Sequence, residues 1–271
     1  MTTASVVFYN NPEDEITKVL SCLQDSIAEK IYVIDHSDSE YIEPIAKSFS
    51  KVIYKSYPNM GFGTGHNHAI KQSIADNSDY HAIINPDIYW DDDAIAGLTA
   101  FMEKNKDCGL VMPKILFPNG EIQYLCKLLP TPMDLFGRRF IPFKGYKERL
   151  NSHYELRWSG YDKIMEIPCL SGCFMFVRTE ILKKIGGFDE RYFLYAEDMD
   201  LCRRIGEVSR TIFNPEVSVY HTFHRASYRS VKYLRLHMKS VVKYFNKWGW
   251  FFDRKRNRHN RRCISVLKSL E

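Results

Sequence analysis

Three acidic residues, Glu197, Asp198 and Asp200, stand close together in residues 193–204, between an aromatic stretch and two arginines. An apolar wall raises the proton affinity of an acid that has no cation beside it, and a protein can make a general base in this way. On a helix Asp200 can pair with an arginine one turn on, whereas Asp198 has no such partner. We therefore predict that Asp198 is a general base. The alternative is an acidic first turn that only suits the helix dipole.

A further carboxylate follows an apolar run at residues 81–84 and a polar turn made by Asn85 and Pro86. This pattern places Asp87 at the carboxyl edge of a sheet, where open α/β sheets bind ligands. One carboxylate at that edge suits a hard divalent cation that takes its other oxygens from a substrate diphosphate. Asn-Pro-Asp is also a common turn sequence, so the motif gains its meaning from its surroundings.

Short apolar runs alternate with helical patterns through the first half of the chain. The runs at residues 4–9, 30–35, 52–55 and 81–85 predict strands, and helices are expected after residue 11, over 69–74 and over 91–104. A repeat of about 25 to 30 residues indicates right-handed crossovers between parallel strands. The chain therefore belongs to the α/β class, with a Rossmann-like, mostly parallel central sheet flanked by helices.

The glycines at positions 61, 63 and 65 make a glycine-rich turn, but this turn follows the third predicted strand. A dinucleotide fingerprint needs its glycines directly after the first strand, where this chain has Tyr9 and Asn10. NAD is therefore not expected as a cofactor. Phosphate contact and plain backbone geometry both remain open for this stretch.

Eight sequence pieces together resemble family 2 glycosyltransferases of the GT-A fold, and within that family the bacterial rhamnosyltransferase-like branch. They occur in the family's order over about residues 4–225. The pieces are residues 7–10, 34–37, 59–67, 84–87, 170–178, 186–190, 197–200 and 219–221.

The resemblance implies a role for each matched residue. Asp198 would deprotonate the acceptor hydroxyl, and Asp35 would accept the imide N–H of a uracil or thymine base. A metal ion, Mg²⁺ or Mn²⁺, would be held by Asp87 and His221. The donor nucleotide would also contact Tyr9, Asn10, Asn59, Gly61, Asn67 and Asn85, and the floor under the sugar and acceptor would be made by Gly172, Cys173 and Glu197.

The resemblance also implies the reaction. We expect a metal-dependent, inverting transfer of a sugar from a nucleoside diphosphate donor, with dTDP-rhamnose favoured, to a cell-surface polysaccharide or lipid-linked glycan. A bound cation can neutralise the departing diphosphate without a proton donor. A UDP-hexose or UDP-N-acetylhexosamine donor is the alternative within the same fold. A nucleotide-sugar-binding protein without turnover is the alternative from another class.

Composition is consistent with one large core. The chain has 271 residues, 45% of them apolar, and seven cysteines. No signal peptide is recognised at the start and no apolar run reaches the roughly 18 residues that span a bilayer. Reduced thiols and a cytoplasmic location, peripheral at the inner face of the cell membrane, are expected. The sequence leaves the oligomeric state open.

Charge divides the chain into two parts. Residues 229–271 carry 13 Lys and Arg against two acids, a balance of +11, so the rest of the chain carries −6 of the total of +5. We predict a GT-A domain over 1–225, with a nucleotide-sugar half at 1–105 and an acceptor half at 106–225, and a basic, aromatic helical tail over 226–271. Nucleic acid is an unlikely partner, because the rest of the chain is acidic and has no recognition motif.

The tail carries an apolar stripe at helical spacing beside basic residues. Aromatic and basic side chains on one amphipathic helix suit an anionic membrane surface. The alternative is a helix that packs its stripe on the catalytic domain. The stripe consists of Leu234, Met238, Val241, Phe245 and Trp248.

Residues 114–168 form a loop-rich insert with basic side chains. Acceptor choice generally resides in such loops. The candidates for contact with a lipid-linked diphosphate or an anionic polysaccharide, which are equally well explained as solvated charges, are Arg138, Arg139, Lys144 and Lys147.

Overall fold

The computed structural model of the protein describes residues 1–137, 141, 143–222 and 231–270. Two of the basic residues singled out in the insert, Arg138 and Arg139, lie outside the described residues, as does the predicted boundary between residues 225 and 226. The other two, Lys144 and Lys147, are exposed on the helix α6 (Lys144–Tyr154).

Within the described residues the chain forms one mixed sheet of nine strands in the order β3-β2-β1-β4-β8-β6-β9-β5, with β7 on β9. The first half is parallel, as predicted, and consists of β3 (Val52–Ser56), β2 (Lys30–Asp35), β1 (Thr2–Phe8) and β4 (Tyr80–Ile84). The second half begins where β8 (Phe174–Arg178) runs antiparallel to both β4 and β6 (Cys108–Leu116). β9 (Arg210–His221) is parallel to β6, and the short strands β5 (Ile88–Tyr89) and β7 (Met165–Glu166) pair with it antiparallel.

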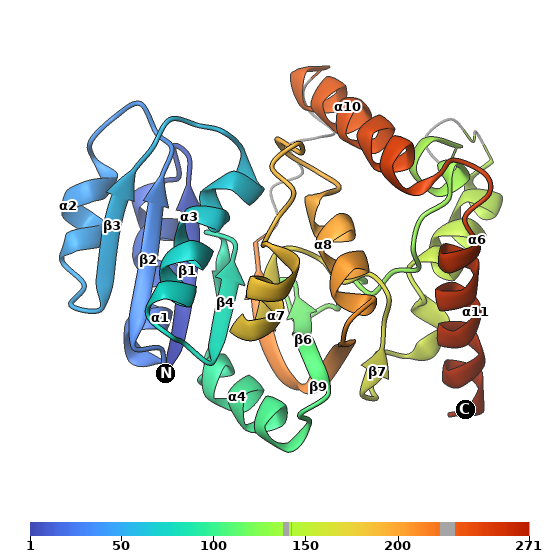
Figure 1. Ribbon diagram of the computed structural model, residues 1–271, viewed down its shortest axis with the longest axis horizontal. Coiled ribbons are helices and arrows are strands. Elements are labelled where there is room, and N and C mark those ends of the chain that lie inside the picture. The colour runs from blue at the N-terminus through green and yellow to red at the C-terminus, as the bar shows by residue number, and fades with distance from the viewer. Residues whose placement is uncertain (138–140, 142, 223–230, 271) are drawn as a thin grey trace.

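Helices flank the sheet, as Figure 1 shows. The first half contributes α1 (Glu13–Asp25), α2 (Ile42–Lys47), α3 (Phe62–Ala75) and α4 (Ala94–Lys104). The second half contributes the single turns η1 (Met133–Gly137) and η2 (Arg157–Ser159), and the helices α6, α7 (Thr179–Ile185), α8 (Glu197–Gly206), α10 (Val231–Trp248) and α11 (Arg254–Ser269). Two boundaries differ from expectation: α3 starts within the glycine run, and α4 starts later because Asp93 caps it by accepting from Ile95 N and Ala96 N.

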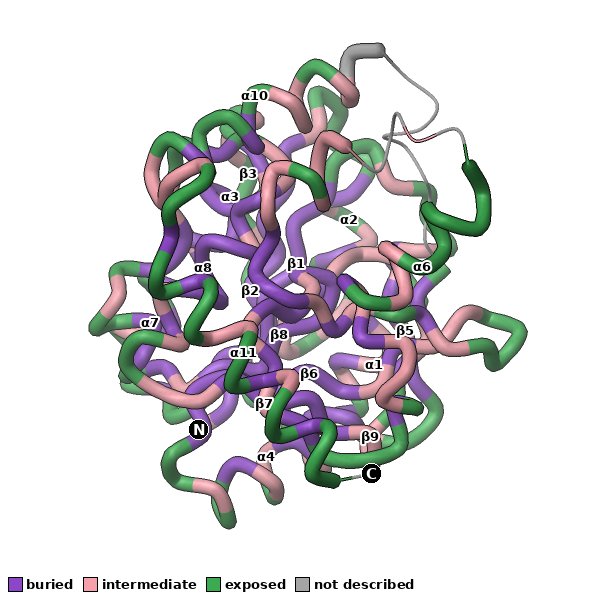
Figure 2. Tube along the Cα trace, turned by 90° about the vertical axis from the view of Figure 1, so that its right-hand side faces the viewer, coloured by how far each residue is buried: buried purple, intermediate pink, exposed green. Residues whose placement is uncertain are grey.

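The central strand β1 is buried along its whole length, as expected for a parallel strand covered on both faces. Figure 2 shows this buried interior and the exposed outer surfaces of α6 and α11. Polar side chains also lie inside: Ser5 Oγ contacts both His66 Nδ1 at 2.8 Å and His81 Nε2 at 2.9 Å. Burial lowers the pKa of His81 to about 3, so both rings stay neutral and tie α3 to the sheet.

The second part of the tail's apolar stripe, Val241, Phe245 and Trp248, packs on the domain, which was one of the two interpretations left open. Val241 and Phe245 are fully buried and cluster with Tyr192 and Met199 from the catalytic half. Farther along, Cys263 and Leu267 of α11 join the main core. Among the described residues, no helix is both long and apolar enough to span a bilayer.

A buried carboxylate ties α10 to the helix that carries the acidic block. Asp200 has no exposed side-chain surface, and its Oδ2 accepts from Arg204 Nε at 2.7 Å, which is the helical pairing expected for this acid. Its Oδ1 accepts from Trp248 Nε1 at 2.8 Å and lies 2.6 Å from Lys247 Nζ. The other arginine, Arg203, instead pairs with Asp253 at the start of α11. The tail helices are thus fastened to α8 by charged groups.

Replacement of Asp200 by alanine is expected to destabilise the protein by about 3–5 kcal/mol, because it removes a fully buried carboxylate that pairs with the partly buried cations of Arg204 and Lys247. Urea unfolding monitored by tryptophan fluorescence would measure the change. The matched control is Asp107→Ala, which removes an ion pair to Arg210 whose acid is 62% exposed and should leave stability nearly unchanged. Equal urea unfolding midpoints for both variants would show that Asp200 does not stabilise the fold.

Candidate active site

The loop before α8 has an unusual backbone conformation that orients the acids at the start of this helix. Tyr195 and Ala196 both have positive φ, at 71° and 68°, which is costly for residues with side chains. The loop is held from α3, where Phe62 N–H donates to Phe193 O at 3.0 Å. A Cβ at Gly61 would lie 2.1 Å from that same oxygen, so glycine is required there. Gly61 therefore serves close packing against the loop before α8.

Asp198 lies in the first turn of α8, half-buried and facing the segment that was predicted to form the floor. Its Oδ2 accepts from Gly172 N–H at 3.1 Å, and its Oδ1 accepts from Met199 N–H at 2.8 Å. A Cβ on Gly172 would be 3.1 Å from Asp198 Cβ. The described residues provide no ion-pair partner for this carboxylate. The structure thus brings Asp198 and Gly172 together, as the sequence indicated.

The apolar wall expected around Asp198 encloses its neighbour instead. Glu197 is buried, and its Oε2 has no hydrogen-bond partner among the described residues. Burial raises the pKa of Glu197 to about 8, and the nearby charge of Asp198 adds to this shift. The sequence argument was wrong on this point, because it could not tell which carboxylate turns inward. Burial therefore favours the protonated form of Glu197, which lies next to the half-buried carboxylate of Asp198.

Glu197→Gln tests this protonation state through stability. Between pH 4.5 and about 8 the unfolded chain loses the Glu197 proton while the folded chain keeps it, so stability falls as pH rises. Glutamine removes this linkage, and the variant should gain stability over the natural chain between pH 5 and pH 8 in urea titrations. Glu180→Gln, at an acid with 73% side-chain exposure, is the control. Parallel pH profiles for the Glu197 variant and the natural chain would contradict a buried neutral acid.

Asp87 and His221 meet at the end of the sheet where β5 and β9 pair. His221 Nε2 lies 3.2 Å from Asp87 Oδ1, and Thr222 N–H donates to Asp87 O at 3.0 Å. The other ring nitrogen contacts Gln123, whose Oε1 lies 2.9 Å from His221 Nδ1. The same side chain donates through Nε2 to His221 O at 2.7 Å. Gln123 was missed from the sequence because 98 residues separate it from the histidine it orients.

These contacts test whether the pair suits a divalent cation. Since Gln123 donates through Nε2, its Oε1 is the acceptor, and His221 Nδ1 must carry the proton. Nε2, the other ring nitrogen, faces the Asp87 carboxylate at 3.2 Å, so a cation between the two could be bound by both. Within the described ranges no group of three or more metal-binding side chains exists. Two protein ligands suit an ion that takes its other oxygens from a diphosphate.

Cys173 connects the two acidic positions. Asn85 N–H donates to Cys173 O at 2.9 Å, which places the turn before Asp87 beside the floor segment. The pKa of the Cys173 thiol is raised to about 12, chiefly by burial and further by the carboxylates of Asp87 and Asp198. Lys127, which the sequence analysis did not assign, acts on the same thiol with the opposite sign. The metal-type pair, the floor and the candidate base therefore converge on one site.

The predicted base-binding residues lie at the carboxyl ends of β1 and β2. Tyr9 is exposed, and Asn10 has a φ of 55° and donates its N–H to Ser37 Oγ at 2.8 Å. Asp35 is buried, with Oδ2 accepting from Tyr54 Oη at 2.8 Å and Oδ1 from Ser37 N–H at 2.8 Å. Each carboxylate oxygen has a further lone pair, so Asp35 keeps acceptor capacity.

The side chains of Asn59 and Asn67 form hydrogen bonds within the protein. Asn59 Oδ1 accepts from Gly61 N–H at 3.0 Å and so shapes the turn into α3. Asn67 is buried, accepts from Phe188 N–H at 2.8 Å and donates to Phe188 O and Glu190 Oε1. Its polar atoms are thus committed to the loop before α8. Contrary to the prediction from the resemblance, we do not carry Asn67 into the nucleotide site.

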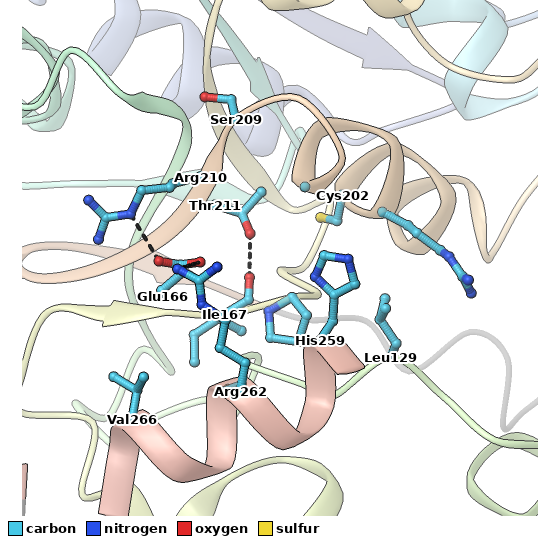
Figure 3. A pocket seen from close by; sticks show the side chains of 14 residues that line it. Leu129, Glu166, Ile167, Cys202, Ser209, Arg210, Thr211, His259, Arg262 and Val266 are labelled. Atoms are coloured by element: carbon cyan, nitrogen blue, oxygen red, sulfur yellow. Dashed lines mark hydrogen bonds and ion pairs between the residues drawn. The ribbon is translucent and has the colours of Figure 1, made fainter. Parts of the chain in front are cut away.

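A separate cavity of about 140 Å³ lies between α8, β7, β9 and α11 (Figure 3) and contains none of these residues. One carboxylate in its lining pairs with two arginines: Glu166 Oε2 lies 2.9 Å from Arg210 Nε, and Glu166 Oε1 lies 3.6 Å from Arg262. Thr211 Oγ1 donates to Ile167 O across the same wall. These contacts fasten α11 to the sheet.

An α/β sheet with acids at its carboxyl edge, a metal-type pair and an open carboxylate defines a GT-A glycosyltransferase domain. The model of Glycosyl transferase family 2 matches residues 3–186, and the chain belongs to this family. The match ends before α8, so it does not cover Asp198.

Curated relatives and solved structures agree with the family. The chain is 27% identical over 195 residues to an N-acetylglucosaminyl-diphospho-decaprenol L-rhamnosyltransferase of Mycobacterium tuberculosis; the alignment covers 68% of this chain and spans 62% of that protein's length. It is also 27% identical over 250 residues to the rhamnosyltransferase WbbL of Escherichia coli K12, covering 88% of this chain and 90% of that one.

Two solved structures share the fold. A mannosyltransferase from Pyrobaculum calidifontis, in complex with GDP-Man and Mn²⁺, has a TM-score of 0.59 at 14% identity, covering 89% of this chain and 64% of that one. TarS 1-349 of S. aureus, in complex with UDP, has a TM-score of 0.57 at 17% identity, covering 90% and 65%. At these identities the likeness concerns the fold alone.

Proposed function

We propose that the protein is a metal-dependent, inverting glycosyltransferase that moves a sugar, with rhamnose from dTDP-rhamnose favoured, from a nucleoside diphosphate to a lipid-linked glycan or cell-surface polysaccharide. The observation that carries the proposal is the continuous series of contacts from Asp87 and His221, through Cys173 and Gly172, to Asp198. Rhamnose is favoured because both relatives named above are rhamnosyltransferases.

The chemistry follows from the charges. Asp198 accepts the proton of the acceptor hydroxyl, and the acceptor oxygen bonds to the anomeric carbon as the bond from that carbon to the diphosphate breaks. One displacement inverts the anomeric centre. A divalent cation, Mg²⁺ or Mn²⁺, held by Asp87 and His221 would neutralise the charge that remains on the departing nucleoside diphosphate. Gly172 N–H keeps the Asp198 carboxylate aimed at the acceptor side.

The donor nucleotide would lie over the ends of β1 and β2. Tyr9 and Asn10 would contact the base, and the remaining acceptor capacity of Asp35 would take an imide N–H, which uracil and thymine have. Asn85 and Gly61 would border the donor, and Cys173 with Glu197 would lie beneath the sugar. Lys127 would add positive charge near the phosphates. The mycobacterial relative's name specifies a decaprenol diphosphate acceptor, which supports a reaction at a membrane, and we propose that the reaction takes place at its inner face.

Thermal-shift titrations of the full chain with dTDP-rhamnose, UDP-sugars and GDP-mannose, each with and without Mn²⁺ or Mg²⁺, test the proposal. Metal-dependent stabilisation by dTDP-rhamnose alone is the expected result. A response to UDP-sugars instead would keep the mechanism and replace the donor. The absence of a thermal shift with every nucleotide would overturn the glycosyltransferase proposal. Donor binding without turnover of any acceptor would favour a nucleotide-sugar-binding protein.

A further inference from the structure

We propose that the turn between α10 and α11 docks on an anionic lipid surface through Phe251 and Phe252. The inference rests on the proposed function in one respect, because a lipid-linked acceptor requires the enzyme to work at a membrane. It narrows the sequence expectation, in which the whole basic and aromatic tail met the lipid. Val241, Phe245 and Trp248 of the apolar stripe pack on the rest of the protein instead.

The two phenylalanines face solvent to an unusual extent. Phe251 is 74% exposed and Phe252 is 99% exposed, at consecutive positions of a tight turn. Met133 of η1 is 56% exposed and lines a shallow, mainly apolar hollow of about 470 Å³ together with Phe251. Adjacent apolar side chains in water are unfavourable and mark surfaces that a partner covers.

Contacts with η1 and α11 hold the backbone of the turn in place, so the exposure of its phenylalanines is a property of the fold. Trp250 stacks on Phe136 with ring centroids 6.0 Å apart. Arg256 donates to the backbone oxygens of Trp250 and Phe251, and the Asp253 side chain caps α11 by accepting from Arg256 N–H at 2.9 Å. Gly249, with a φ of 99°, allows the chain to reverse. The framework holds the backbone of the turn in place and leaves the two phenyl rings outside.

The positive charge beside the turn favours an anionic lipid surface over a second copy of the chain as the partner. Arg254 and Arg258 are exposed on α11 directly after the turn, and the described residues provide no acid as a partner for either. Phenyl groups next to arginines match an interface with anionic headgroups above and acyl chains below. Two copies that meet through this turn would bring their arginines together, and like charges oppose such an interface.

The position of the turn suits an enzyme whose acceptor is in a membrane. The same helix that ends at the turn holds the catalytic loop, since Ser240 Oγ donates to Leu194 O at 2.8 Å. From Ser240 to Trp248 the helix rises about 12 Å. Figure 1 shows α10 lying across the top of α8 and leading into this turn. Docking would therefore hold the catalytic loop at a fixed height above the lipid.

Flotation of the full chain with vesicles of phosphatidylglycerol or of phosphatidylcholine tests the proposal. The natural chain should float with phosphatidylglycerol and much less with phosphatidylcholine, and the double variant F251S/F252S should lose at least about tenfold in partition. Arg254→Glu with Arg258→Glu should remove the preference for the anionic vesicles. The matched control is Ile27→Ser, at an apolar side chain that is 47% exposed beside the start of β2, and it should float normally.

Equal flotation of F251S/F252S and the natural chain would overturn the inference. So would a change from dimer to monomer in sedimentation of the same variant with no vesicle binding by either form, which would assign the turn to a second copy. Failure of the proposed function is distinguishable. Donor thermal shifts and transfer to a water-soluble, short-chain acceptor should be the same for F251S/F252S and the natural chain, whether or not vesicles bind.

Discussion

Asp198→Asn is expected to lower kcat by about 10²–10⁴-fold, because asparagine cannot take the proton of the acceptor hydroxyl. The amide oxygen can still accept from Gly172 N–H, so the loop and the floor should keep their positions. Donor affinity should therefore change little, and kcat and kcat/KM should fall together. Steady-state transfer assays combined with calorimetric titration of the donor would measure both quantities.

The control for this prediction is Asp107→Asn, which alters an exposed carboxylate far along the chain and should leave kcat unchanged. An Asp198 variant that retains kcat would remove this residue as the base. If the Glu197→Gln variant then lost turnover while Asp198→Asn did not, the roles of the two neighbouring acids would have to be exchanged.

Asp87→Ala is expected to abolish metal-dependent donor binding while leaving the fold intact. The remaining ligand, His221, is a single imidazole, and one such group cannot hold Mg²⁺ or Mn²⁺ in place. Calorimetric titration of Mn²⁺ in the presence of a nucleoside diphosphate would measure the loss. Gln123→Ala should cost about 10–100-fold in metal affinity, since it orients the ring without touching the ion.

The neighbouring variant Asp92→Ala serves as the control, because this exposed carboxylate lies beyond β5, which begins directly after Asp87, and should leave metal binding unchanged. Undiminished Mn²⁺ affinity of the Asp87 variant would show that the ion, if required, is held elsewhere. Retention of full transfer activity in chelator would contradict metal dependence itself.

The class of fold could be predicted from local patterns because buried parallel strands are continuous apolar runs that end in polar turns. Four such runs were predicted close to β1, β2, β3 and β4, and all four form the parallel half of the sheet. The antiparallel insertion of β8 between β4 and β6 could not be predicted, since strand order depends on packing between segments that are distant in the sequence, such as Tyr80 with Arg178 and Val111 with Phe176.

The candidate base and metal carboxylate were predicted from residue type, position and the family resemblance, and both roles stay predictions. Three features needed the tertiary structure. These are the orientation of His221 by Gln123, the commitment of Asn67 to the loop at Phe188, and the burial of Glu197 rather than Asp198. Each depends on a contact between segments that are distant in sequence, or on which side of a helix faces inward.

For the tail, the sequence by itself determined the charge, the helical period and the apolar stripe, because these are properties of neighbouring residues. Only the tertiary structure decided that Val241 and Phe245 face the catalytic domain and that Phe251 and Phe252 face solvent. The physical reason is that an amphipathic stripe needs an apolar partner but does not specify one. The partner is selected by the buried ion pairs of Asp200 and Arg203, whose two halves lie about 50 residues apart and meet only in the folded chain.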